Sequence, residues 1–335
     1  MTKTPRLFLL GLVLIVIVGS ITYLEAKKPK TAQTQTTSSG VTTVGSPYQE
    51  FQNPSGFVNT EPFALSEYIG KKVILVDFWT YTCINCQRTT PYLNAWWEEY
   101  EDDGLLIVGI HSPEFEFEKV LANVQNAVTE EGIEYPVVLD NDKSTWNAYG
   151  NRYWPRKYLI DLNGNVVYDL IGEGNYEETE AKIREVLGVT GDMSSPENTV
   201  GVDFTQVTSP ETYFGSSRAD NLVFTSIEPL SLSADTAYLV GEWEQEEESA
   251  SNFMGQASIL YTYTSKNVYL VASAVSFTNV NSVDLEIWLD GKYLKTISIG
   301  DETLYPLIEG TDYGTHTLKL IPKGPGIELF AFTFG

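Results

Sequence analysis

Hydrophobic and polar residues fall into blocks of changing period between residues 47 and 190. Unbroken apolar runs at Val73–Trp79 and Leu105–Ile110 predict strands that are buried on both faces, because a half-exposed strand would alternate. Shorter runs predict further strands at 137–139, 157–160 and 166–170. Asn163-Gly164 is typical of a tight hairpin between the last two.

Apolar residues at helical spacing follow both long runs. A helix is predicted from Cys83, with an apolar face formed by Leu93, Trp96, Trp97 and Tyr100. A second helix is expected to have Ser112 as its N-cap and Pro113 at its first position. Its buried stripe is expected to be Phe117, Val120, Leu121, Val124 and Val128. With a closing helix at 176–187, the pattern predicts an α/β layer with a mixed sheet over residues 47–190.

The pattern changes to short alternating runs after residue 201. Such runs start at Ala237, Ala257, Val268, Val283, Tyr293, His316 and Ile327. Asp290-Gly291 predicts a hairpin between two of them. Residues 201–335 are therefore predicted to be a jelly-roll-like β-sandwich, joined to the first domain by a Pro/Ser/Gly-containing linker at 191–200.

The amino-terminal residues carry a different signal. Leu7–Leu24 contains no charge and is long enough to span a bilayer, so residues 1–26 are predicted to be an uncleaved signal-anchor. A cleaved signal peptide and secretion are the alternative. Residues 27–46 are rich in Thr, Ser, Gln and Gly, which predicts a flexible linker. The expected location is the cell membrane, with a single span and the soluble domains outside the cytoplasm.

Composition limits the function classes. A chain of 335 residues has room for two domains with separate cores. Its formal net charge of -24 argues against nucleic acid or anionic lipid headgroups as partners of the soluble part.

The chain has only two cysteines, Cys83 and Cys86, in a C-x-x-C motif. This spacing favours a redox-active disulfide with no other cofactor. A structural disulfide is one alternative. A zinc site is another, but it would need two more ligands, and only His111 and His316 are available, in different predicted domains. At the amino end of a helix, where a thiolate is favoured, Cys83 would attack the partner disulfide, and Cys86 would resolve the mixed disulfide.

Three stretches carry a resemblance to a known family. VDFWTYTCINC followed by Pro91 resembles the thioredoxin active site, and the long insertion before Trp154-Pro155 resembles the TlpA/ResA branch of that fold. CINC, GIHSPEFEFEK and YWPRKYLID together resemble the thioredoxin domain of DipZ-type proteins. The sequence departs from ordinary thioredoxin at Ile84-Asn85, where that family has Gly-Pro, and at Trp154, which precedes the proline.

SPETYFGSSRADN, from Ser209, is similar to the opening of the C-terminal module of DipZ-type proteins, which resembles carbohydrate-binding modules. The resemblance therefore implies a possible glycan ligand for this domain. Candidates for a sugar-stacking platform are Tyr213, Trp243, Tyr261, Tyr263 and Trp288, although such aromatics are more often core residues.

Two acidic residues are candidate catalytic groups. Asp77 interrupts a buried strand, so burial is expected to raise its pKa, which suits proton exchange with Cys86. The matching acid of thioredoxins has that role; the alternative is a hydrogen-bonded strand residue. Glu114 matches in position a glutamate that ResA-like proteins use near the dithiol, although a first-turn acid is also favoured by the helix dipole.

Other candidates are expected to form the substrate surface. The resemblance implies that Pro155 is the cis-proline facing the dithiol, with Trp154 and Trp79 on an apolar rim for the partner protein, alongside Tyr81. His111 is more simply structural. Arg152, Arg156 and Lys157 are expected to solvate an edge rather than act on the thiolate.

These features predict a protein thiol-disulfide oxidoreductase that reduces protein disulfides. Since no second cysteine pair exists, the family implies recharging by a membrane thiol-disulfide carrier of CcdA/DsbD type, with cytochrome c maturation or repair of oxidised cysteines as the task. A disulfide oxidase or isomerase would use the same residues. A binding protein with an inert thioredoxin scaffold is a further alternative, and a peroxiredoxin-like peroxidase is disfavoured because Val76 stands where that motif needs proline.

Overall fold

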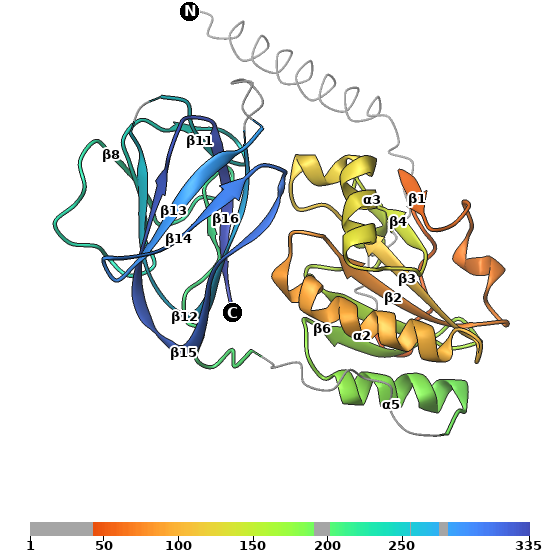
Figure 1. Ribbon diagram of the computed structural model, residues 1–335. Helices are drawn as coiled ribbons and strands as arrows, with labels where there is room; N and C mark the ends of the chain where they lie inside the picture. The colour runs from red at the N-terminus through yellow and green to blue at the C-terminus, as the bar shows by residue number, and fades with distance from the viewer. Residues whose placement is uncertain (1–42, 191–201, 255, 275–280) are drawn as a thin grey trace, which may run out of the picture. The chain divides into compact units, whose positions relative to one another are not determined.

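The computed structural model describes residues 43–190, 202–254, 256–274 and 281–335 (Figure 1). The predicted anchor at 1–26, most of the predicted linker at 27–46 and all of the linker at 191–200 lie outside these residues. Within the described part of the chain, no helix has the length and apolar character needed to cross a membrane.

The first domain contains a mixed six-stranded sheet with the order β1-β4-β3-β2-β5-β6. At its centre, β2 pairs in parallel with β3, and β3 pairs in parallel with β4. The edges are antiparallel. The strands are β1 (Gly56–Val58), β2 (Val73–Trp79), β3 (Leu105–His111), β4 (Val137–Leu139), β5 (Arg156–Ile160) and β6 (Val166–Ile171). The five strands predicted in this region are confirmed.

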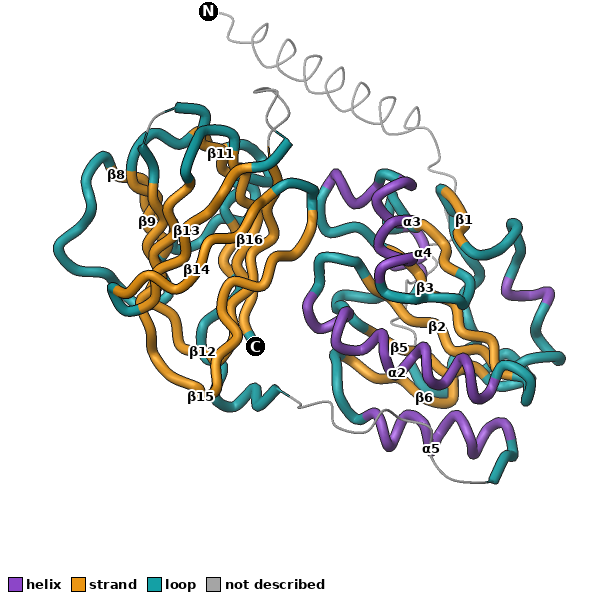
Figure 2. Tube along the Cα trace, in the orientation of Figure 1, coloured by secondary structure: helices purple, strands orange, loops and turns teal. Residues whose placement is uncertain are grey.

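The central strands are mostly apolar because both faces of the sheet are covered. Val73, Leu75 and Trp79 of β2 pack into one cluster with side chains of α2 (Ile84–Tyr100), α3 (Leu121–Glu130) and α5 (Tyr176–Leu187). The alternate residues of β2 face a second cluster that contains Trp146 of α4 (Ser144–Ala148). Figure 2 shows the helices around the sheet. This is the expected thioredoxin-like arrangement.

The predicted helix after β3 is wrong in its start and in part of its buried stripe. Ser112 caps no helix and instead donates its hydroxyl hydrogen to Asp140. A 3-10 turn, η2 (Glu116–Lys119), comes first, and the regular helix α3 begins only at Leu121. This delay shifts the helical phase, so Val120 and Leu121 are exposed.

Several short elements carried too little periodicity to be predicted. They are β1, the 3-10 turn η1 (Leu65–Glu67) and α4. Residues 43–46, at the end of the predicted linker, also pack on the domain: Gly45 N–H donates to Val166 O at 2.8 Å. Strand β1 is held by antiparallel pairing with β4, and the other short segments are held by loop hydrogen bonds. Both kinds of interaction join residues that are distant in sequence.

The C-terminal domain is all-β, with ten strands in one hydrogen-bonded network. The main path runs β10-β11-β16-β12-β15-β13-β14, with β7 on β16 and β9 between β12 and β8. The strands are β7 (Thr212–Tyr213), β8 (Leu222–Thr225), β9 (Ala237–Val240), β10 (Glu244–Gln245), β11 (Ala250–Asn252), β12 (Ser258–Ala274), β13 (Val283–Leu289), β14 (Lys292–Ile299), β15 (Thr303–Pro322) and β16 (Ile327–Phe334).

Strand β12 joins two of the predicted strands. The runs at Ala257 and Val268 were predicted as separate strands, but they form the single 17-residue strand β12. Its pairing with β15 shifts register between Ser265 and Asn267, so the irregularity that looks like a break in the sequence is a bulge. The hairpin at Asp290-Gly291 is confirmed, with both residues at positive φ (51° and 75°).

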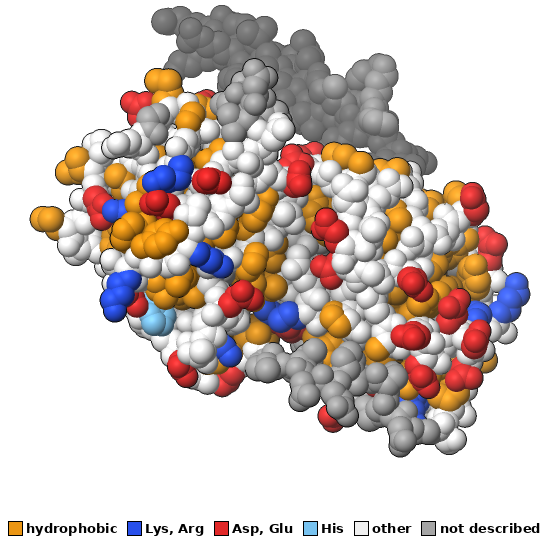
Figure 3. Space-filling view, in the orientation of Figure 1, with side chains coloured by type: hydrophobic (Ala, Val, Ile, Leu, Met, Phe, Trp, Pro, Cys, Tyr) orange, Lys and Arg blue, Asp and Glu red, His pale blue; other side chains and the backbone are white. Residues whose placement is uncertain are grey.

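The visible surface of the first domain is acidic. Figure 3 shows Asp and Glu side chains spread over the region of α2 and α5, with few basic side chains between them. A polyanion would be repelled by such a surface.

Candidate redox site

The C-x-x-C motif lies where β2 turns into α2. Cys83 is the N-cap residue of α2, and its carbonyl accepts hydrogen bonds from Cys86 N–H and Gln87 N–H, both at 3.0 Å. Cys83 is partly exposed, whereas Cys86 is buried, and both are free thiols. The first cysteine can therefore meet a partner disulfide, and the second can act only from inside the domain.

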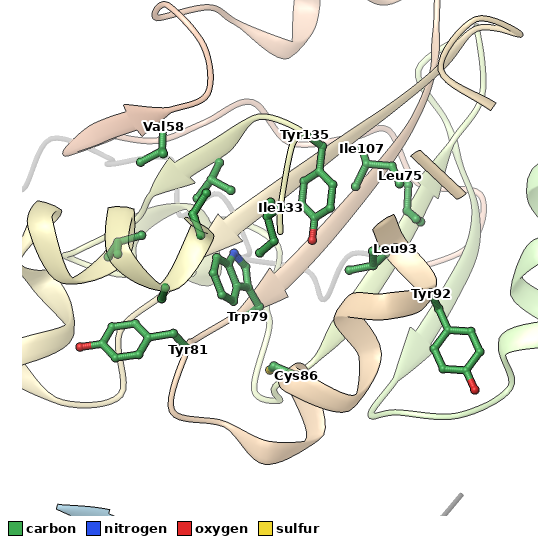
Figure 4. Packing of buried hydrophobic residues seen from close by; sticks show 14 of the residues in the cluster. Val58, Leu75, Trp79, Tyr81, Cys86, Tyr92, Leu93, Ile107, Ile133 and Tyr135 are labelled. Carbon is green, nitrogen blue, oxygen red and sulfur yellow. The ribbon is translucent and has the colours of Figure 1, made fainter. Parts of the chain in front are cut away.

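Cys86 lies on the side of α2 that faces the buried cluster with Trp79 and Leu93 (Figure 4). Burial raises the pKa of the Cys86 thiol well above its usual value. The hydrogen bond with Cys83 and the negative charges of Cys83 and Asp77 raise it further. Cys86 therefore holds its proton at neutral pH, and an attack by Cys86 needs a base nearby.

Asp77 supplies a carboxyl group inside the same region. It is 2% exposed, and burial raises its pKa, while the charge of Lys157 opposes that rise. Its influence on the pKa of Cys86 means that the two groups interact electrostatically. The rise predicted for the pKa of Asp77 is thus present, as a proton acceptor for Cys86 requires.

Lys157 is the partner of Asp77. Its Nζ lies 3.2 Å from Asp77 Oδ1 and is fully buried, because the two residues are opposite each other in the β2–β5 pairing. Neither atom has a hydrogen-bond partner of good geometry, so the contact is an ion pair rather than a hydrogen bond. The prediction that Lys157 solvates an edge is wrong. Arg156 is also buried, and it forms a two-pronged pair with Asp169 at 3.0 and 2.7 Å.

Trp79 and Tyr81 do not form the predicted docking rim. They are 4% and 5% exposed, and both pack against the ring of His111, Trp79 edge-on and Tyr81 stacked. Burial lowers the pKa of His111 to about 3, so this imidazole is neutral and structural. Both rings are therefore packed inside the domain, where a partner protein does not reach them.

A pocket of about 450 Å³ opens over the first cysteine. Its lining includes Cys83, Asn85, Glu114, Arg152 and Trp154. Trp154 is half-buried, donates its indole N–H to Ser112 O at 2.9 Å and precedes Pro155 through a cis peptide bond, as predicted. The candidate residues Cys83, Glu114 and Trp154 are thus brought together, whereas Trp79 is not.

Glu114 is held by the C-terminal domain. The described residues from 43 to 335 belong to one compact unit. Within it, Tyr213 Oη donates to Glu114 Oε1 at 2.8 Å, and Arg218 forms an ion pair with the same oxygen at 2.7 Å. The Arg218 guanidinium also lies over the Tyr213 ring, 3.9 Å from its centre. Glu114 thus lies in the pocket lining as a carboxylate held by one cation and one hydroxyl donor.

Glu118 is a site residue that the sequence analysis missed. It is fully buried, and Thr82, directly before Cys83, donates its hydroxyl hydrogen to Glu118 Oε1 at 2.5 Å. The glutamate follows Phe117 in an alternation of acidic and aromatic residues, which looks like a solvated helix face. Its burial arises only because the turn η2 folds it toward the C-x-x-C loop.

The candidate sugar-binding aromatics separate into two groups. Tyr261 and Tyr263 are core residues packed on Phe334. Trp288 packs edge-to-face with Tyr293 on the β13–β14 hairpin, and Tyr293 is 52% exposed. Across the described residues, no group of three or more His, Cys, Asp or Glu is placed to hold a metal ion.

Comparison with known proteins agrees with these domains. Residues 43–187 match the family model "Redoxin", and residues 209–335 match "Thioredoxin like C-terminal domain". The chain is 36% identical over 302 residues to Protein DipZ of Mycobacterium tuberculosis, covering 84% of this chain and 42% of that protein. The chain thus spans less than half the length of this relative.

Two further relatives match a shorter part of the chain. NHL repeat-containing protein 2 of Bos taurus is 43% identical over 131 residues, which are 38% of this chain and 18% of that protein. Thiol-disulfide oxidoreductase ResA of Bacillus anthracis is 29% identical over 133 residues, which are 37% of this chain and 74% of that protein. The chain is thus similar to the Redoxin family over residues 43–187, to the thioredoxin-like C-terminal domain over residues 209–335, and to DipZ across both regions.

Proposed function

We propose that this chain is an extracytoplasmic thiol-disulfide oxidoreductase that reduces protein disulfides through Cys83 and Cys86. The observation that carries the proposal is the pairing of a partly exposed N-cap cysteine with a buried cysteine that interacts with a buried carboxyl group. The name of the relative ResA, a thiol-disulfide oxidoreductase, supports the same reaction class.

The proposed reaction has two steps. The Cys83 thiolate attacks one sulfur of the partner disulfide, forming a mixed disulfide and releasing a partner thiolate. Cys86 then gives its proton to Asp77 and attacks the Cys83 sulfur, which releases the second partner thiolate. Two electrons pass to the partner, its two thiolates take up protons, and the chain is left with a Cys83–Cys86 disulfide.

Recharging needs an external dithiol, since both cysteines of the chain are consumed in one turnover. We infer that a membrane thiol-disulfide carrier of CcdA/DsbD type supplies it. The apolar segment Leu7–Leu24 supports attachment to the membrane in which such a carrier would lie. Cytochrome c maturation and repair of oxidised cysteines are the tasks that the family resemblance favours.

A glycan role for the C-terminal domain, as a carbohydrate-binding-like β-sandwich, is a separate proposal. The Trp288–Tyr293 pair supports it, because Tyr293 is 52% exposed and sugar rings stack on exposed aromatic faces. Titration with soluble oligosaccharides, monitored by tryptophan fluorescence in the wild type and in Trp288→Ala, would detect it. Equal spectra with and without oligosaccharide would contradict it.

The test of the main proposal is the reduction potential of the cysteine pair, measured by equilibration with glutathione and then with dithiothreitol. A value at or below about -270 mV would support a reductase, and a value near -120 mV would indicate an oxidase. Absence of any redox equilibrium would overturn the redox function and favour a binding protein.

A matched pair of variants separates the roles of the two sulfurs. Cys86→Ser should accumulate a mixed disulfide with a peptide disulfide, because the resolving thiol is missing. Cys83→Ser should form none, because the remaining thiol is buried. Equal trapping by both variants would contradict the assigned order of attack.

A further inference from the structure

The carboxylate of Glu118 accepts hydrogen bonds from two separate loops. Its Oε1 accepts from Thr82 Oγ1–H at 2.5 Å and from Thr82 N–H at 3.4 Å. Its Oε2 accepts from Phe115 N–H at 3.0 Å and from Glu114 N–H. All four contacts are donors to the carboxylate, which is the pattern that an ionised carboxylate satisfies, because a protonated one would need an acceptor.

These two loops form neighbouring parts of the pocket over Cys83. Thr82 is the residue before Cys83, and Glu114 begins the other loop; all three line the pocket. On the helix side, Gln87 Nε2 donates to Tyr81 O at 2.8 Å. The turn from β2 into α2 is therefore held from one side by Gln87 and from the other side by Glu118.

Burial of a carboxylate at this position is costly. Burial raises the pKa of Glu118, and the charge of Glu114 raises it further, while hydrogen bonds from Thr82, Thr80 and Phe115 oppose the rise. Lys143 is the cation that interacts with it electrostatically. An apolar residue would fill the space without the desolvation penalty, so packing alone does not account for a glutamate here.

We propose that Glu118 is a positioning residue that holds the Thr82–Cys83 turn in the geometry from which the disulfide with Cys86 closes. The inference rests on the proposed redox function. Two thiols held close together form their disulfide with a higher effective concentration than two thiols on a loose loop. Glu118 therefore makes the dithiol a stronger reductant.

Glu118→Gln tests this inference. The amide keeps the size of the side chain but replaces one oxygen with an NH2 group, so either the Thr82 donors or the Glu114 and Phe115 donors face another donor. We expect about a tenfold loss of effective concentration, which corresponds to a reduction potential about 30 mV less negative.

The matched control is Glu116→Gln on the same turn. The Glu116 side chain is 70% exposed and forms an ion pair with Lys119 of the same turn, so its loss should leave the potential unchanged. Thermal unfolding of each reduced variant is measured in parallel. A lower melting temperature for Glu118→Gln with an unchanged potential would show a merely structural role and overturn the proposal.

A second variant covers the case in which Glu118→Gln does not fold. Thr82→Val removes one hydroxyl donor and leaves the carboxylate in place; it should shift the potential in the same direction by a smaller amount. An unchanged potential in Thr82→Val would then overturn the proposal. If the wild type itself shows no redox equilibrium, the proposed function fails, whereas a redox-active wild type with unaffected variants rejects only the role of Glu118.

Discussion

The two domains differ in what they bury. Among the described residues of the first domain, seven acidic or basic side chains are buried: Asp77, His111, Glu118, Asp140, Arg156, Lys157 and Glu180. Among the described residues from 202 to 335, the buried polar residues are only Ser, Thr and Asn. The C-terminal domain therefore has a core assembled from alternating apolar residues, whereas the first domain carries charges in its interior.

This difference indicates that the reactive site lies in the first domain. Buried ionisable groups cost stability, and they concentrate at sites that need shifted pKa values or fixed geometry. Glu118 bonds to the C-x-x-C turn, Asp77 interacts with Cys86, and Lys157 is linked to this region through its ion pair with Asp77. The C-terminal domain contributes to the pocket through side chains at its surface, such as Tyr213.

The largest effect is expected from breaking the buried ion pair. Asp77→Asn leaves the Lys157 ammonium buried without a counter-charge, which should lower the free energy of unfolding by about 3–5 kcal/mol. Loss of the proton acceptor for Cys86 should also slow reduction of a peptide disulfide by about 100-fold. Urea unfolding and a turnover assay measure the two effects.

The double variant Asp77→Asn/Lys157→Met distinguishes these effects. Removing both charges eliminates the unpaired ammonium, so most of the stability should return, while turnover stays slow because the acid is still missing. Recovery of turnover together with stability would contradict a role of Asp77 in proton transfer.

The next largest effect is expected in the pH dependence of the unfolding free energy, which the buried His111 influences. In the folded chain the pKa of His111 is about 3, below its usual 6.5, so the unfolded chain binds the extra proton between these values. The contribution of neutral His111 to the free energy of unfolding is thus fully present above about pH 6.5. It is lost as the pH falls toward 3, by up to about 1.4 kcal/mol per pH unit. Urea unfolding at pH 7.5, 6 and 5 measures this slope.

His111→Gln isolates that contribution. Buried acids with raised pKa values, such as Asp77, act in the opposite direction, so the difference between wild type and variant is the informative quantity. His316→Gln is the control, because His316 is partly exposed beside Asp290. A pH dependence that is identical in wild type and His111→Gln would contradict the prediction.

The smallest effect is expected in the C-terminal core. Tyr261→Phe removes the hydrogen bond between Tyr261 Oη and Thr212 Oγ1, 2.9 Å long, and should cost about 1 kcal/mol of unfolding free energy. The reduction potential should not change, since the ring still packs on Phe332 and Phe334. A shift of the potential as large as that expected for Glu118→Gln would contradict the contrast between the two domains.

The hydrophobic periodicity of the sequence was sufficient to predict those helices and strands that are long and regular. The runs at Val73–Trp79 and at 176–187 predicted β2 and α5 with the observed bounds. It was insufficient around Ser112, where a serine followed by proline resembles a helix start but the side chain bonds to Asp140. Local signals describe what a segment favours alone, and a distant hydrogen-bond partner can outweigh them.

The sequence by itself determined the strand–helix order, the C-x-x-C dithiol at a helix start and the raised pKa of Asp77, because each depends on a local motif or on burial within a strong apolar run. The family resemblance added the cis-proline at Pro155. Only the tertiary structure decided that Trp79 and Tyr81 are buried, that Lys157 neutralises Asp77, that Arg218 pairs with Glu114 and that Glu118 joins the two loops at Cys83. These facts depend on which residues meet across the sheet and between loops, and such meetings are set by packing of the whole domain rather than by the pattern of any one segment.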